Sequence, residues 1–142
     1  MRSAALLLVA SVLVSAGCGE TDRLSRAELR ARANATCRQF ERDLVHTPGG
    51  LTENDLAAII KANERRAAAL SNLRPPKADE ERWTRYLALV NQATQRWREL
   101  RTKVIHGQSE ESLLAADAHY FAHLAYRGDQ IEDVLGLGEC DV

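Results

Sequence analysis

The sequence predicts an all-α fold, an antiparallel up-down four-helix bundle. Four segments of the chain carry apolar residues three or four positions apart, which is the spacing of one helix face. Each segment is bounded by residues that start or stop helices. No stretch shows the apolar–polar alternation of a half-buried strand. Four such helices of roughly 20 to 30 residues, joined by short connections, favour the up-down bundle.

Before the first helix, the sequence predicts a signal peptide over residues 1–17. Arg2 is the only charged residue before Glu20, and the stretch from Ala4 to Val14 is apolar apart from one serine. The small residues Ser, Ala and Gly follow it, which completes the charged–apolar–small order of an export signal. The run is too short for a membrane-spanning helix, which needs about 20 apolar residues. We therefore expect this leader to be removed.

The leader ends at Cys18, and residues 14–18 (Val-Ser-Ala-Gly-Cys) resemble the lipobox of bacterial lipoproteins. The resemblance implies that the Cys18 thiol takes a diacylglyceryl group and that a dedicated peptidase cuts before it. Ser15 departs from the pattern, which usually has an aliphatic residue there. The alternative is an ordinary signal peptidase that cuts after Ala16 and releases a secreted protein. Two or more acyl chains would hold the protein on the membrane, since each buried CH₂ contributes about 0.8 kcal/mol.

Cleavage before Cys18 divides the chain into a signal peptide (1–17), a lipidated cysteine with its tether (18–24) and a four-helix domain (25–142). The mature chain holds 125 of the 142 residues, enough for one domain. It carries 18 basic and 20 acidic residues, because one of the nineteen basic residues is lost with the leader. This near balance argues against nucleic acid as a partner.

The tether keeps the domain close to the membrane, because six residues span at most about 20 Å. Four arginines lie at the end of the tether and in the first turns that follow it, with Glu28 among them. We interpret them as a solvated helix face, with contact to anionic lipid headgroups as the alternative. They are Arg23, Arg26, Arg30 and Arg32.

The chain has three cysteines, an awkward number for an exported protein. If Cys18 carries lipid, Cys37 and Cys140 remain, and in an oxidising compartment they have one possible pairing. A bridge between them would close a loop of about 100 residues. In an up-down bundle the first and fourth helices are antiparallel neighbours, which brings these cysteines together. The alternatives are two free thiols or a metal pair without further ligands.

The first helix is predicted to begin at Ser25, where Ser25 and Glu28 form a capping-box pattern, and to end before Pro48. Thr52 caps the second helix in the same way, and Pro75 ends it. The predicted buried face of the first comprises Leu29, Ala33, Cys37, Phe40 and Leu44. That of the second comprises Leu56, Ile59, Ile60, Ala67, Leu70 and Leu73.

The third helix is predicted to start with the acids at 79–81, where the helix dipole favours them, and to end at Gly107. Ser109 caps the fourth helix and Gly136 ends it. The predicted buried face of the third comprises Trp83, Tyr86, Val90, Ala93, Trp97, Leu100 and Val104. That of the fourth comprises Leu114, Ala118, Phe121, Leu124, Ala125, Gly128, Ile131 and Leu135.

Several of these features occur together in one group of proteins. The lipobox, the early cysteine in the first helix, the turn from Leu70 to Pro76 and the ending from Leu135 to Cys140 resemble small secreted or lipid-anchored helical proteins of actinobacterial type. The shared motifs are two turns and a bridge. The resemblance therefore implies an architecture and no catalytic activity.

The fourth helix carries one candidate metal site, His119 and His123, which are four residues apart. Both lie about 160° around the helix from Phe121, so we expect them to face solvent. Two imidazoles without a third ligand make at best a weak site for zinc or copper. An exposed polar face is the favoured interpretation.

Other chemistry is not expected, and we predict neither an enzyme nor a cofactor. Paired Glu-x-x-His motifs and Cys-x-x-Cys-His are absent from the sequence. The periodicity buries Cys37, which removes it as a nucleophile. Asn63 and Asp117 lie on otherwise apolar faces, where we expect each to pair with a neighbour inside the bundle.

The sequence thus predicts a lipoprotein on the extracytoplasmic face of the cell membrane, with secretion as the alternative location. Its helical domain would act by binding or as a structural partner, and another envelope protein is the expected partner. The alternative function is metal binding or sensing through His119 and His123.

Overall fold

The computed structural model describes residues 22–44 and 52–140, and every regular element in these segments is helical. The four α-helices are α1 (Arg26–Leu44), α2 (Glu53–Ser71), α3 (Glu80–Ile105) and α4 (Glu110–Leu135), with a short 3₁₀ helix η1 (Lys77–Asp79) before α3. The predicted all-α bundle is confirmed. The leader and Cys18 lie outside the described residues. Among the described helices, none is both long enough and apolar enough to cross a membrane.

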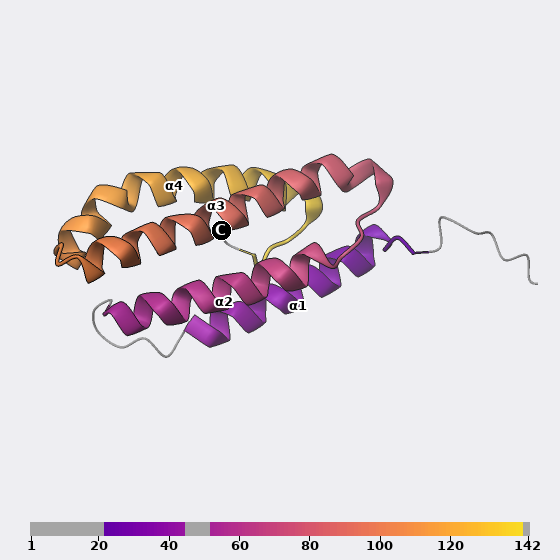
Figure 1. The fold of residues 1–142 in the computed structure, drawn as a ribbon. Coiled ribbons are helices and arrows are strands. Elements are labelled where there is room, and N and C mark those ends of the chain that lie inside the picture. The colour runs from indigo at the N-terminus through magenta and orange to yellow at the C-terminus, as the bar shows by residue number, and fades with distance from the viewer. Residues whose placement is uncertain (1–21, 45–51, 141–142) are drawn as a thin grey trace, which may run out of the picture.

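The helices lie as two pairs (Figure 1). α1 packs beside α2, α3 packs beside α4, and α2 contacts α3 to join the pairs. α1 and α4 were expected to be neighbours along their lengths. In the described chain they instead meet through the last turn of α4 and residues 136–140, which we call the tail and which run back between the pairs to α1.

Three helices begin with the capping patterns that the sequence predicts. The Ser25 amide donates to Glu28 Oε2 (2.8 Å) and the Glu28 amide donates to Ser25 Oγ (3.2 Å). Thr52 and Asp55 make the same reciprocal pair before α2. Ser109 accepts from the Ser112 amide before α4. Each side chain satisfies backbone N–H groups that the helix itself leaves unpaired.

The main core lies where α1, α2, the first half of α3 and the tail converge. It takes Leu29, Ala33 and Cys37 from α1, as predicted. Its other members are Leu70, Trp83, Tyr86, Val90, Leu135, Leu137 and Cys140. A smaller cluster joins Leu89, Ala93 and Leu124 between α3 and α4.

The first half of α4 is less buried than the sequence suggests. Ala118 is exposed, so its predicted inward position is wrong, and Leu114 and Phe121 are half-buried. Phe121 stacks on the Trp97 ring of α3, with the ring centroids 4.5 Å apart. The reason is that α3 is the helix that packs along α4, so one neighbour covers only a narrow stripe of it.

Candidate functional site

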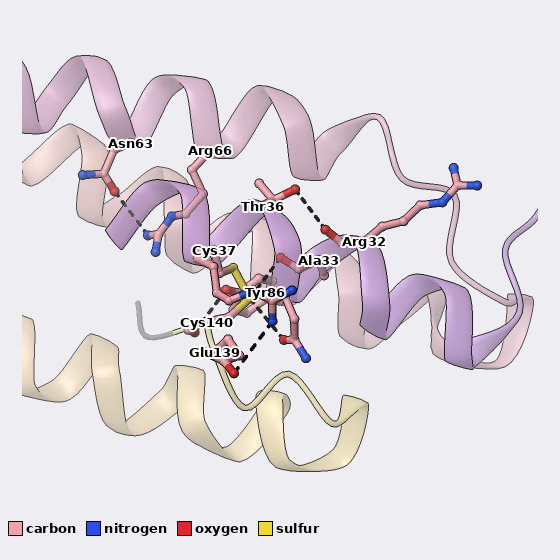
Figure 2. Close-up of a disulfide and its surroundings, with 11 residues drawn as sticks. Arg32, Ala33, Thr36, Cys37, Asn63, Arg66, Tyr86, Glu139 and Cys140 are labelled. Atoms are coloured by element: carbon pink, nitrogen blue, oxygen red, sulfur yellow. Dashed lines mark hydrogen bonds and ion pairs between the residues drawn. A yellow bond between two sulfur atoms is a disulfide. The ribbon is translucent and has the colours of Figure 1, made fainter. Parts of the chain in front are cut away.

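The predicted disulfide is present and joins α1 to the tail (Figure 2). Cys37 and Cys140 have Cα atoms 5.0 Å apart although 103 positions separate them in the sequence. Both are buried. The Tyr86 hydroxyl, in α3, donates to the Cys140 carbonyl oxygen at 3.3 Å. The bond therefore lies at a junction of α1, α3 and the tail, and its thiols are consumed.

A left-handed glycine directs the tail toward this junction. Gly136 has a φ of 73°, and the Leu137 amide donates to the Glu132 carbonyl oxygen (2.9 Å) as α4 ends. Leu137 then enters the core, and the Cys140 amide donates to the Leu137 carbonyl oxygen (3.2 Å). A compact turn of four residues thus carries the chain from the end of α4 to Cys37.

An apolar groove lies between α1 and α2, and we call it the α1–α2 groove. It encloses about 360 Å³, within the size range of small-ligand pockets. Ala35, Ala62 and Ala69 contribute small side chains to its lining, and Phe40 contributes an aromatic ring. Thr36, Gln39, Asp43, Arg65 and Arg66 complete its lining.

Arg66 is the unexpected member of this groove, because its side chain is 3% exposed on a helix face predicted to be apolar. Its guanidinium carbon lies 4.0 Å from the Phe40 ring centroid, a cation–π arrangement. Its Nη2 donates to Asn63 Oδ1 (3.2 Å), and Asn63 Nδ2 donates to the Ile59 carbonyl oxygen (3.0 Å). Asn63 thus pairs inside the bundle as predicted. The burial of Arg66 is indicated by its position, because it lies three residues after Asn63 and four before Leu70 and therefore on the same helix face.

Charged side chains form the rim of the groove. Arg65 Nη2 lies 2.7 Å from Asp43 Oδ2, and Gln39 Nε2 donates to Asp43 Oδ1 (2.9 Å). The Gln39 bond and the nearby guanidinium hold the pKa of Asp43 below its ordinary value. The rim is therefore a fixed ion pair at neutral pH above an apolar floor.

Asp117 is held by α3, which explains its position on an apolar face. Arg96 Nε donates to Asp117 Oδ2 (2.9 Å), a second guanidinium bond reaches Oδ1, and Arg96 Nη1 donates to Glu99 (2.6 Å). These carboxylates raise the pKa of Arg96, and the Arg96 bond lowers that of Glu99. The predicted pairing of Asp117 inside the bundle is confirmed.

His119 and His123 are both exposed on α4, as their angular position predicts. The nearest carboxylate along the chain, Asp117, is engaged by Arg96. Across residues 22–44 and 52–140, no three potential metal-ligating side chains come together. The two imidazoles therefore form at most a two-ligand pair on the part of the surface that is described.

No protein-family model matches this chain, and comparisons with curated proteins and with solved structures likewise give no match. The molecule is a disulfide-closed helical bundle that carries an apolar groove between its first two helices.

Proposed function

We propose that the protein is a lipid-anchored extracytoplasmic protein whose helical domain binds a partner and does not catalyse a reaction. The observation that carries the proposal is the use of the cysteines. Cys37 and Cys140 are consumed in a buried bridge, which leaves Cys18, at the end of the leader, as the remaining one of three. A structural disulfide favours an oxidising compartment outside the cytoplasm.

The anchor is tested by expressing the full chain with its leader in a bacterial host and separating membranes from soluble protein. We expect the wild-type chain in the membrane fraction, with an intact mass above that of the polypeptide from Cys18 onward by the mass of its lipid. Cys18→Ser should move the protein to the soluble fraction, whereas Cys140→Ser should leave it on the membrane. A soluble wild-type chain that begins at Gly17 would contradict the anchor and support secretion.

The α1–α2 groove is the surface that best suits the binding role. It combines an apolar floor, an aromatic wall and a few charged groups, the mixture typical of pockets that bind organic ligands or apolar side chains. Arg66 beside Phe40 lies within it, and a guanidinium in such a place can orient an anionic or carbonyl group of a ligand.

A photo-crosslinking residue placed at Ala69, which lines the groove and is exposed, tests this assignment in intact cells. We expect one adduct of defined mass from this position and none from Ala122, an alanine on α4 that is also exposed. Filling the groove from the α1 side with Ala35→Trp should abolish the adduct. Adducts of equal yield from Ala69 and Ala122 would rule out the groove as the binding surface.

The proposal of a non-catalytic role is supported by two pairs of a hydroxyl and a carboxylate, Ser25 with Glu28 and Thr52 with Asp55, whose bonds are explained by helix capping. Glu28 and Asp55 accept short bonds from Ser25 and Thr52, at 2.7 Å in each case. In an active site such pairs can activate a nucleophile. Here both pairs are capping boxes that also bind backbone amides, so helix initiation accounts for them.

The alternative function is metal binding through His119 and His123, which are one turn apart and exposed. Titration of the purified domain with zinc and with copper tests it. A dissociation constant below about 0.1 mM that weakens at least tenfold on His123→Ala would support a chelating pair. Unchanged affinity in the variant would remove the alternative.

A further inference from the structure

A second hollow lies between the first turns of α3 and the last turns of α4, and we call it the arginine hollow. It encloses about 290 Å³. Three arginines border it, Arg82 and Arg85 from α3 and Arg127 from α4. Its apolar lining comes from Leu89, Ile131 and Val134, and Val134 is 50% exposed to solvent.

The helix turns that border the arginine hollow, the first of α3 and the last of α4, lie toward the end of the bundle where α1 begins (Figure 1). The Leu24 amide donates to the Arg74 carbonyl oxygen (2.9 Å), and Arg23 Nη2 lies 3.1 Å from Glu80 at the start of α3. These contacts fix the start of the described chain beside the first turn of α3. Cys18 is four residues before Asp22, so a lipid there would lie within about 14 Å of Asp22.

The hollow carries more positive charge than its neighbours neutralise. Arg85 pairs with the exposed Glu81 (2.5 Å). Arg82 is 3.7 Å from Asp79, but that carboxylate is held by two shorter bonds from Arg26. Arg127 makes no ion pair within the described part of the chain.

The acids of α4 lie on another side of that helix. At about 100° per residue, Asp129 and Asp133 are roughly 160° and 120° around the axis from Arg127. They border a separate hollow together with Gly136 and Leu137. The end of the bundle therefore has a basic, partly apolar side and an acidic side, so that only one side suits an anionic surface.

We propose that the arginine hollow rests on the anionic phospholipid surface to which the chain is anchored. Guanidinium groups suit phosphate oxygens in geometry and charge, and Val134 would contact the glycerol and upper acyl region. The proposal rests on the proposed anchor for its biological setting. Two arginines nearer the tether are engaged within the fold, Arg26 by Asp79 and Arg23 by Glu80 and the Pro75 carbonyl oxygen.

The test uses the mature chain without lipid, residues 17–142 carrying Cys18→Ser, in sedimentation with vesicles. One set contains phosphatidylcholine alone and the other an equal mixture with phosphatidylglycerol. We expect binding to the anionic vesicles that weakens roughly tenfold in the Arg85→Gln/Arg127→Gln variant. The matched control is Arg98→Gln/Arg101→Gln, two exposed or half-exposed arginines in ion pairs toward the other end of α3, which should weaken binding less than twofold.

Three outcomes would overturn the proposal: no preference for anionic vesicles, equal weakening by both double variants, or displacement of the protein by millimolar glycerol phosphate. The last would assign the hollow to a soluble anion instead of a surface. Circular dichroism of both variants establishes that they are folded. Failure of the anchor is a separate result, because it is read from the mass at Cys18 and leaves vesicle binding unaffected.

Discussion

Gly136 shows how one residue determines the path of the chain from α4 to α1. Its φ of 73° is left-handed, a region that side chains with a Cβ disfavour. The Arg30 guanidinium also lies across it, so that a Cβ at this position would come within 2.6 Å of Arg30 Cζ. Backbone strain is therefore the main cost of a side chain at this position, and the flexible end of the Arg30 side chain would also have to move aside.

We predict that Gly136→Ala lowers the free energy of unfolding by about 1–2 kcal/mol from backbone strain, with only a small further loss because the flexible end of Arg30 can move aside. In an Arg30→Ala background most of the cost of Gly136→Ala should persist, since the backbone strain remains when the Arg30 side chain is gone. Urea unfolding of the four variants of this cycle measures both parts. Gly138→Ala is the control, because it has no positive φ and open space at its Cβ, and equal costs at both glycines would contradict the argument.

At the same scale, the sequence predicted some single positions well and missed others. Burial of Cys37 and pairing of Asn63 and Asp117 followed from helical periodicity, because each shares a face with apolar residues. Arg66 was missed because a charged residue on such a face is expected to be exposed. Its burial depends on Phe40 in another helix, which local spacing does not reveal.

Among the elements, the start of α3 is fastened to α1 by a buried carboxylate. The sequence predicts that Asp79 is one of the acids stabilised by the helix dipole at the start of α3. It is the residue before α3, but its side chain makes no capping bond and instead accepts two bonds from Arg26, at 2.8 and 2.6 Å. Its side chain is 1% exposed. The pairing of α1 with α3 at this end is therefore electrostatic as well as apolar.

This link makes stability depend on pH in a defined direction. The Arg26 bonds hold the pKa of Asp79 below its ordinary value, so the folded state favours the ionised form. The stabilisation is complete above the unfolded pKa, near 4, and is lost as the pH falls through the folded pKa. Capping bonds lower the pKa values of Glu28 and Asp55 in the same direction.

We predict that Asp79→Asn costs about 2 kcal/mol at pH 7 and has a smaller effect once the pH falls through the lowered pKa of Asp79, where the wild-type carboxylate becomes protonated. Chemical unfolding between pH 7 and pH 2 measures the difference. Asp22→Asn, which removes an exposed pair with Arg74, should change stability little at any pH. A cost for Asp79→Asn that is the same at pH 2 and pH 7 would contradict the role of the ion pair.

The helices were predictable from the sequence because residues at or next to their ends determine where each helix begins and stops. The capping pairs at Ser25 and Thr52 and the glycines at 107 and 136 act within a few residues. The exposure of the first half of α4 was not predictable in this way. It depends on how many helices cover that face, which is a property of the assembled fold.

For the whole molecule, the disulfide is the main constraint on the unfolded chain. It joins positions 103 residues apart, so reduction frees a loop that spans most of the domain. On the chain-entropy account, closing a loop of that length contributes about 4–5 kcal/mol. Small domains have total stabilities of about 5–15 kcal/mol, so the bridge accounts for a large share.

We predict that reduction lowers the free energy of unfolding by about 4 kcal/mol and shifts the urea midpoint down with little change in helix content below the transition. Urea unfolding followed by circular dichroism, with and without reductant, measures this shift. Cys37→Ala/Cys140→Ala should reproduce the reduced protein and no longer respond to reductant. A midpoint unaffected by reduction would show that packing alone fixes the tail.

At this scale the sequence predicted the fold class and the cysteine pairing, because both follow from counts and periodicity. It did not predict either hollow. The α1–α2 groove exists because Ala62 and Ala69 oppose Ala35 and Phe40 across two helices. The arginine hollow exists because the last turns of α4 lie beside the first turns of α3. Both depend on the register between helices, which short sequence patterns leave open.

The bridge also has a mechanical consequence. If the proposed anchor and partner are right, force between a lipid at Cys18 and a partner held by the domain would enter the folded chain through α1 and reach Cys37 after 19 residues. Beyond that point the load is carried by the covalent ring that Cys140 closes. Even if α1 were pulled out to Cys37, the tether would lengthen to at most about 65 Å. The disulfide would thus set an upper limit on the distance between the anchor and the folded domain.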